Sequence, residues 1–265
     1  MKIVCLKGGL GNQMFEYCRF RDLMESGHDE VYLFYDHRRL KQHNGLRLSD
    51  CFELELPSCP WGVKLVVWGL KICRAVGVLK RLYDDEKPEA VLIDDYSQHR
   101  RFIPNARRYF FFRQFLAELQ SGFVQMIRAV DYPVSVHVRR GDYLHPSNSI
   151  FGLCGVDYFQ QAIAYVRKKR PDARFFFFSD DMEWVRENLW MEDAVYVEHT
   201  ELMPDYVDLY LMTLCRGHII SNSTFSFWGA YLAVDGNGMK IYPRRWFRDP
   251  TWTSPPIFSE EWVGL

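Results

Sequence analysis

Short apolar runs that end in polar loops, separated by segments with helical spacing, constrain the fold of this chain most strongly. The run at 3–6 ends at a glycine turn, helical spacing covers 13–26, and a second apolar run follows at 31–35. Strand, turn, helix and strand in this order open a βαβ unit, whose two strands lie parallel. The second half repeats the alternation: we expect strands over 133–138, 174–178, 194–197, 218–220 and 240–242, and helices over 157–169, 182–188, 205–215 and 225–234.

The two stretches of alternation are separated by an interval, about 38–100, in which little periodicity is legible. The pattern therefore predicts an α/β protein with two Rossmann-like lobes that face each other across a cleft. We expect the N-terminal lobe to cover residues 1–130 and the C-terminal lobe 131–265. In open α/β sheets, ligands bind beyond the carboxyl ends of the strands, so the loops at those ends are the first places to search for a site.

Composition narrows the classes of function. A formal net charge of −1 argues against a nucleic-acid-binding protein that works through a global basic field. The seven cysteines form no C-x-x-C pair, which favours reduced thiols in a cytoplasm. The N-terminal apolar run is too short for a signal peptide, and no uncharged stretch is long enough to span a membrane. We therefore expect a soluble cytoplasmic protein.

The first polar loop, 8–13, reads Gly-Gly-Leu-Gly-Asn-Gln and follows the first strand. Glycines let backbone N–H groups approach a ligand, and the following helix N-terminus favours anionic groups. The loop is not a complete G-x-G-x-x-G, so dinucleotide binding is weakly supported. A tight strand–helix turn with Asn12 as the helix N-cap explains the same residues equally well.

The second loop follows the strand at 133–138 and reads His137-Val138-Arg139-Arg140-Gly141-Asp142-Tyr143. Alternate residues of a strand share a face, so His137 and Arg139 point the same way. A guanidinium at the carboxyl end of a strand suits a diphosphate, because its fork pairs with two phosphate oxygens. The alternative is a solvated arginine pair closed by a Gly-Asp turn, and we favour the functional interpretation.

The third loop, Ser221-Asn222-Ser223-Thr224, follows the strand at 218–220 and leads into a helix. Its hydroxyl and N–H groups could bind a phosphate, although the same residue types also serve as simple helix caps. The chain contains no Asp-x-Asp, no clustered metal ligands, no Gly-x-Ser-x-Gly and no Walker lysine. A nucleotide-sugar enzyme without a metal would have to neutralise its leaving diphosphate with arginine and helix N-termini, which these loops supply.

The segment 61–79 has helical spacing, with Leu65, Trp68 and Ile72 on one face and lysines and arginines on its flank. A basic amphipathic helix of this kind could contact anionic lipid. We favour a surface helix with snorkelling lysines, because Gly69 and Gly77 weaken the helix.

The three loops, in this order and spacing, resemble those of the bacterial alpha-1,2-fucosyltransferases (glycosyltransferase family 11-like). The resemblance rests on 8–15, 137–143 and 221–226 and covers nearly the whole chain. That family is similar in turn to alpha-1,6- and protein O-fucosyltransferases, which have a GT-B-like fold and need no divalent metal. Two departures stand out: Glu16 occupies a position where the family usually has Gln, and Phe227 one where it usually has Trp.

The resemblance also implies roles for individual residues. Arg139 would contact the β-phosphate of GDP-fucose and stabilise the departing GDP, and Asn12 would lie beside the fucose and diphosphate. His137 would lie near the guanine or its ribose, and Asp208 would accept the guanine N1–H and N2–H. The remaining residues expected at the substrate are Gly9, Gly11, Arg140, Ser223, Thr224, Phe225 and Ser226, and we expect neither a metal nor a cofactor.

The implied reaction is an inverting transfer of L-fucose from GDP-fucose to a galactose hydroxyl of a surface glycan such as an O-antigen or capsule. The acceptor could be lipid-linked, and peripheral contact with the inner face of the cell membrane is compatible with this role. A general base would help to remove the hydroxyl proton. Asp142 and Glu16 are the carboxylates of the motifs, but Asp142 could serve only to orient arginine and Glu16 could lie too deep. The alternatives are transfer of another GDP-sugar and a catalytically silent glycan- or nucleotide-binding protein.

Overall fold

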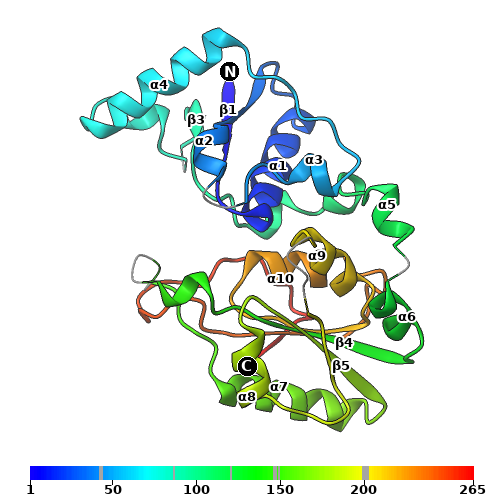
Figure 1. The fold of residues 1–265 in the computed structure, drawn as a ribbon. Helices are drawn as coiled ribbons and strands as arrows, with labels where there is room; N and C mark the ends of the chain where they lie inside the picture. Colours follow the sequence, from blue (N-terminus) through cyan, green and yellow to red (C-terminus); the bar gives the residue numbers. More distant parts are fainter. Residues whose placement is uncertain (42–43, 86, 120, 146–147, 149, 199–202) are drawn as a thin grey trace. The chain divides into compact units, whose positions relative to one another are not determined.

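The computed structural model describes residues 1–41, 44–85, 87–119, 121–145, 148, 150–198 and 203–265. It divides into two compact units, Met1–Arg113 and Gln114–Leu265, each built on a parallel sheet of its own (Figure 1). The predicted α/β class with two Rossmann-like lobes is confirmed. Among the described residues, no helix combines the length and apolarity needed to cross a membrane.

The boundary between the units precedes the expected one at 130/131. Two short helices, α5 (Gln114–Ala117) and α6 (Gly122–Arg128), belong to the second unit. The Ser121 hydroxyl caps α6 by accepting the Val124 N–H at 3.1 Å, and Val124 and Ile127 bury the inner face of this helix. Because α6 is anchored in this way just before the first strand of the second sheet, the unit starts earlier than the strand pattern indicated.

The sheet of the first unit has the order β2-β1-β3, with β1 at Lys2–Leu6, β2 at Val31–Tyr35 and β3 at Leu92–Ile93. Helices α1 (Leu10–Glu25) and α4 (Trp61–Ala75) lie on opposite sides of β1 (Figure 1). The α4 side is filled by an apolar cluster that includes Ile3, Cys5, Val63 and Val67. The remaining elements of this unit are α2 (His37–Leu40), α3 (Leu48–Cys51), η2 (Lys80–Leu82), η3 (Arg100–Phe102) and η4 (Ala106–Arg108).

The second unit contains a sheet of order β6-β5-β4-β7-β8-β9, in which all neighbouring strands are parallel. Its strands are β4 (Tyr132–Val138), β5 (Ala173–Ser179), β6 (Val195–Tyr196), β7 (Gly217–Ile219), β8 (Lys240–Tyr242) and β9 (Val263–Gly264). The other elements are η5 (Asp142–Leu144), α7 (Val156–Lys169), α8 (Met182–Asn188), α9 (Tyr206–Thr213) and α10 (Thr224–Tyr231).

Strand β4 is buried along its whole length, as expected for a parallel strand covered on both faces. Val134, Val136 and Val138 pack into the cluster that contains α7 residues such as Phe159 and Val166. The intervening residue His137 therefore points to the opposite face, where its ring meets Phe225 of α10. This alternation sends the side chains that carry chemistry to the α10 face of the sheet.

The strands and helices expected from the sequence are present, with shifts of a few residues at their ends. Strands β3 and β9 were not predicted, because two residues give no detectable alternation. Helix α4 ends at Ala75 instead of continuing to 79. Gly77, at φ +76°, donates to the Arg74 carbonyl at 3.2 Å while Val78 donates to that of Cys73 at 2.9 Å, which closes the helix as a Schellman motif.

Candidate active site

Two of the three polar loops meet at one edge of the second sheet. Strands β4 and β7 are direct neighbours, with Val136 paired to Ile219, so their carboxyl ends lie side by side. The side chains that follow are joined by a hydrogen bond of 3.0 Å between His137 Nδ1 and Ser221 Oγ. The sequence-predicted loops at 137–143 and 221–226 therefore form one continuous surface.

His137 is a buried, neutral histidine. Its side chain lies 5.8 Å from the Phe225 ring, centroid to centroid, and only 5% of the residue is exposed. Burial, reinforced by the nearby Arg139 charge, lowers the pKa of His137 to about 3. The imidazole thus offers one donor and one acceptor nitrogen at neutral pH, and the bond to Ser221 uses one of them.

Arg139 is held at the sheet edge by two carboxylates. Its Nε lies 2.8 Å from Asp142 Oδ1, and its Nη1 lies 3.1 Å from Asp180 Oδ2. About a third of the side chain remains exposed (32%), so a ligand can reach the guanidinium. Asp142, 44% exposed, orients the arginine in this structure, which is one of the two roles that its place in the motif suggested.

Arg140 turns to the other face of the sheet and is engaged in packing. Its Nε donates to Asp181 Oδ2 at 3.1 Å, and its guanidinium carbon lies 3.9 Å from the centroid of the Trp184 ring. Asp181 also caps α8 by accepting the Trp184 N–H at 3.1 Å. The two consecutive arginines therefore have separate surroundings, although both were expected at the substrate.

Asp180 was missed by the sequence analysis. Besides pairing with Arg139, it accepts the backbone N–H of Arg140 at 2.9 Å. A Cβ at Gly141 would lie 2.9 Å from Asp180 Oδ2, so the glycine makes room for this carboxylate. The sequence could have indicated Asp180, because it follows β5, whose last residues pair with those of β4.

The N-terminus of α10 borders this surface. Ser223 is the N-cap residue, yet its side chain makes no capping hydrogen bond, which disfavours a purely capping role for the Ser-Asn-Ser-Thr run. Thr224 and Phe225 are half-buried, and Ser226 is buried with its hydroxyl donating to the Ser223 carbonyl at 3.1 Å. Asn222 was expected in this loop but was given no role of its own. Its amide donates to the carbonyls of Gly152 (2.6 Å) and Trp246 (2.7 Å) and so holds the loop in place.

Aromatic side chains pack behind the 221–226 loop. Phe227, which replaces the usual family tryptophan, is fully buried and stacks on Trp262 with centroids 5.3 Å apart. Asp208 lies in the first turn of α9, the helix that packs against α10, and is 6% exposed. The structure therefore places Asp208 on the same side of the sheet as His137.

The glycine loop belongs to the first unit. Helix α1 begins at Leu10 with Gly9 as its N-cap, so Asn12 lies inside the first turn and the alternative in which Asn12 caps the helix is wrong. Gly11 also lies in that turn. Gly8 has φ +69°, and a Cβ there would lie 2.7 Å from Asn12 Nδ2. Asn12 Oδ1 accepts a hydrogen bond of 2.9 Å from Gln98, in the loop that follows β3.

Glu16 lies beneath this loop and is fully buried. Its Oε2 accepts the Lys7 N–H at 2.8 Å, while Oε1 has no hydrogen-bond partner among the described residues. Burial raises the pKa of Glu16 well above its ordinary value, which favours the neutral carboxylic acid. A neutral acid has nearly the shape of the glutamine amide usual in the family, and it cannot serve as an exposed base.

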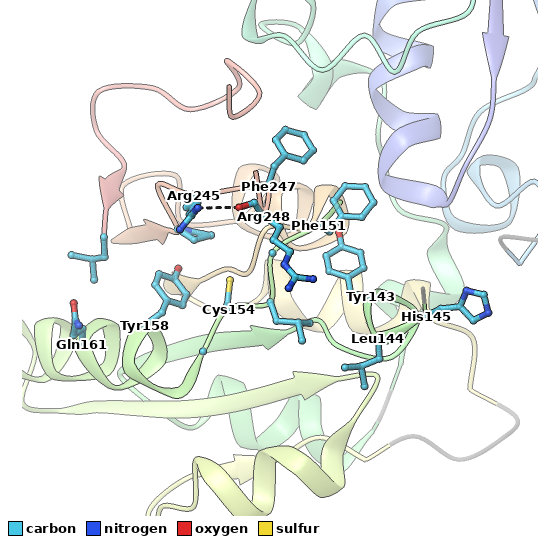
Figure 2. A pocket seen from close by; sticks show the side chains of 15 residues that line it. Tyr143, Leu144, His145, Phe151, Cys154, Tyr158, Gln161, Arg245, Phe247 and Arg248 are labelled. Carbon is cyan, nitrogen blue, oxygen red and sulfur yellow. Dashed lines mark hydrogen bonds between the residues drawn. The ribbon is translucent and has the colours of Figure 1, made fainter. Parts of the chain in front are cut away.

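A cavity of about 750 Å³ in the second unit begins at Tyr143, the last residue of the 137–143 loop. Figure 2 shows Tyr143 and Phe151 on one side of it, Arg245 and Arg248 above, and Tyr158 and Gln161 on α7. The Tyr143 and Phe151 rings are stacked with centroids 4.7 Å apart. Of the 137–143 loop only Tyr143 lines the cavity, and none of the residues expected at the donor does, so we place the candidate site at Arg139 and α10. Among the described residues, no group of three or more potential metal ligands is present.

Comparison with known proteins identifies the family. The family model described as "Glycosyl transferase family 11" matches residues 105–265, more than half of the chain. The chain belongs to this family. The match includes both loops of the second-unit site, and family 11 membership establishes the protein as a glycosyltransferase.

Similar individual proteins agree with this assignment. The chain is 28% identical to an alpha-1,2-colitosyltransferase of Escherichia coli, over 98% of this chain and 97% of the relative. It is 25% identical to the O-antigen biosynthesis glycosyltransferase WbnK of Escherichia coli, over 98% and 99%. Half of the chain is 33% identical to galactoside 2-alpha-L-fucosyltransferase SEC1 of Bos taurus, covering 38% of that protein.

Solved structures support the fold. The crystal structure of the fucosyltransferase NodZ from Bradyrhizobium superposes with a TM-score of 0.53 at 16% identity, over 88% of this chain and 92% of NodZ. A crystal structure of NodZ alpha-1,6-fucosyltransferase soaked with GDP-fucose also gives a TM-score of 0.53, at 14% identity over the same shares of the two chains. This similarity confirms the GT-B-like class expected from the sequence.

Proposed function

We propose that this glycosyltransferase moves L-fucose from GDP-fucose to a galactose 2-hydroxyl of a surface glycan, with inversion and without a metal ion. The observation that supports the donor most directly is the Arg139 guanidinium, partly exposed at the carboxyl end of β4, on the surface that the N-terminus of α10 borders. A diphosphate placed there meets a permanent positive charge and a helix N-terminus. The NodZ structure soaked with GDP-fucose and the similarity to SEC1 support the sugar and the galactose acceptor.

In the proposed reaction the acceptor oxygen attacks the anomeric carbon from the face opposite GDP. The bond between this carbon and the β-phosphate oxygen breaks, and the electron pair leaves with GDP, whose charge Arg139 stabilises. The hydroxyl proton passes to a carboxylate or to water. Asp142 is the carboxylate of the motif that is exposed, whereas Glu16 is buried and its pKa is raised by that burial.

A second candidate function is transfer of colitose, the 3-deoxy analogue of L-fucose. It is favoured by the near-full-length similarity to the alpha-1,2-colitosyltransferase. The similarity to WbnK supports an O-antigen as the acceptor for either sugar. The residues around Arg139 contact the diphosphate in this proposal, so they do not distinguish a sugar with a 3-hydroxyl from one without.

The test is release of GDP in the presence of EDTA, with GDP-fucose, GDP-colitose or GDP-mannose as donor and lactose as acceptor. We expect acceptor-dependent release from GDP-fucose at a kcat/KM above that of the other two donors, and a product whose fucose is α-linked to the galactose 2-position. Greater efficiency with GDP-colitose would establish the second candidate instead. A requirement for added Mn²⁺ or Mg²⁺ would overturn the metal-independent mechanism. Binding of GDP-fucose without release would point to an acceptor other than lactose, and failure of a folded sample to bind GDP-fucose would overturn the donor.

A further inference from the structure

Helix α4 presents an apolar stripe to solvent. Trp61, Leu65, Trp68 and Ile72, spaced to share one helical face, are 65%, 51%, 48% and 66% exposed. The opposite face, with Val63, Val67 and Leu70, is buried against the sheet of the first unit. The helix thus has an apolar inner face and an apolar outer face, and the outer one has large side chains that nothing in the described structure covers. Exposed apolar patches of this kind mark interaction surfaces.

The exposed stripe continues beyond the helix. After the Schellman motif at Gly77, Val76, Val78 and Leu79 are 66%, 50% and 51% exposed. Leu79 has φ +54°, a left-handed conformation that leucine rarely adopts. The chain therefore keeps apolar side chains at the surface through the turn, where polar residues would normally stand.

The charged residues within the segment that carries the stripe are all cationic. Residues 61–83 contain the basic residues Lys64, Lys71, Arg74, Lys80 and Arg81 and no Asp or Glu. Lys71 and Arg74 lean toward Asp94, at 3.9 and 3.4 Å, on the sheet side of the helix. Lys80 and Arg81 are exposed beside Leu79. Apolar side chains bordered by positive charge fit a surface that is both apolar and anionic.

We propose that α4 and the turn that follows it form a docking surface for an anionic membrane, with the helix lying in the plane of the lipid headgroups. Tryptophan favours the membrane–water interface, and each nearby Lys or Arg is attracted by anionic headgroups. A second copy of this chain fits less well, because an isologous contact through this face would oppose two sets of like charges. The inference concerns binding alone and does not depend on the proposed reaction.

The test is flotation of the intact protein with vesicles of phosphatidylcholine, with and without 25% phosphatidylglycerol. We expect binding to the anionic vesicles that weakens as salt is added, and much weaker binding to the neutral ones. Ile72→Glu or Leu65→Glu should lower the partition coefficient at least about tenfold, because a buried apolar side chain is replaced by a charge. Lys80→Gln and Arg81→Gln should each lower it about fivefold.

Val234→Glu is the matched control, since Val234 is 79% exposed and lies in the other unit. It should bind the anionic vesicles like the unmodified protein, and all variants should keep the same thermal melting temperature. The proposal is overturned if the unmodified protein stays unbound at low salt, or if Ile72→Glu binds as well as Val234→Glu. It is also overturned if the protein sediments as a dimer that Ile72→Glu dissociates while vesicle binding is absent, which would make a second copy the occupant.

Discussion

Arg139 and Arg140 are neighbours in sequence but have different surroundings. A substitution at Arg139 should therefore affect turnover, and one at Arg140 should affect stability. Arg139→Ala removes the partly exposed guanidinium at the proposed diphosphate site, and turnover should fall by about 10²–10³-fold, the usual cost of losing one such donor. Arg140→Ala removes the Asp181 pair and the Trp184 contact and should lower the free energy of unfolding by about 1–2 kcal/mol.

Steady-state rates and thermal melts of both variants test this difference. An Arg139→Ala protein with unchanged turnover would contradict the role of this residue. If Arg140→Ala lost activity as severely while melting normally, then Arg140 would contact the substrate after all.

Glu16 makes stability depend on pH in a predictable direction. Its folded-state pKa is raised, so its contribution to stability is complete below the unfolded pKa of about 4.3 and is lost as the pH rises from there toward the folded value. Glu16→Gln removes the ionisable group and nearly keeps the shape of the side chain. We expect the variant to match the unmodified protein near pH 4 and to exceed it in stability by a margin that grows toward neutral pH.

Denaturant unfolding at several pH values measures this margin. Glu192→Gln, at an exposed position, is the control and should leave the pH dependence unchanged. A margin for Glu16→Gln that shrinks as the pH rises would mean that Glu16 is ionised in the folded protein.

The residues of the site were predictable where they follow strands directly. His137 lies near the end of β4, and Arg139 and Ser223 occupy loops; their place at the carboxyl edge follows from the parallel alternation alone. Asp180 and Asn222 position other parts of the site through hydrogen bonds and an ion pair. The sequence predicts the loops in which they lie, but not which residues they bind. The separation of Arg140 from Arg139 follows from strand alternation and was within reach of the sequence.

At the scale of elements, the turn from β1 into α1 is fixed by one glycine. Gly8 and Gly27 both have positive φ, +69° and +80°, but only at Gly8 would a Cβ meet another side chain, that of Asn12. Alanine at either position should cost about 1–2 kcal/mol of stability through the left-handed backbone. Gly8→Ala should in addition displace Asn12 and reduce turnover severalfold more than Gly27→Ala does.

Thermal melts and initial rates of the two glycine variants provide the comparison. Equal losses of activity would show that the position of Asn12 is unimportant to the reaction.

Helix α4 shows what periodicity can and cannot establish. The spacing of 65, 68 and 72 correctly indicated one helical face, and we expected an ordinary surface helix. A second apolar set at 63, 67 and 70 shares the helix, and only the packing reveals that this second set faces the sheet. Hydrophobic spacing identifies faces, but the neighbouring element decides which face is buried.

At the scale of the whole molecule, the donor site and the glycine loop lie in different units. If GDP binds at Arg139 and α10, then GDP alone at about 100 times its Kd should stabilise the protein by about 2.7 kcal/mol. We expect slowed amide hydrogen exchange in the loops after β4 and β7 and at the start of α10, with smaller changes in β1 and β2.

Hydrogen-exchange mass spectrometry with and without GDP locates this protection. Protection confined to the residues around the large cavity, such as Tyr158 and Gln161, would instead place the nucleotide there. The two-lobe organisation itself was predictable, because each sheet has its own run of alternation. The boundary was not, because α5 and α6 are too short to produce a pattern that assigns them to either side.

The pairing of Arg139 with Asp142 and Asp180 has a kinetic consequence. With no donor bound, the guanidinium already lies between two carboxylates, so a diphosphate that reaches its exposed part competes with them for its N–H groups. An acceptor that bound before the donor would meet carboxylates that are still paired with Arg139. The arrangement therefore favours an ordered sequential scheme, in which the nucleotide sugar is the leading substrate and GDP is the last product to leave.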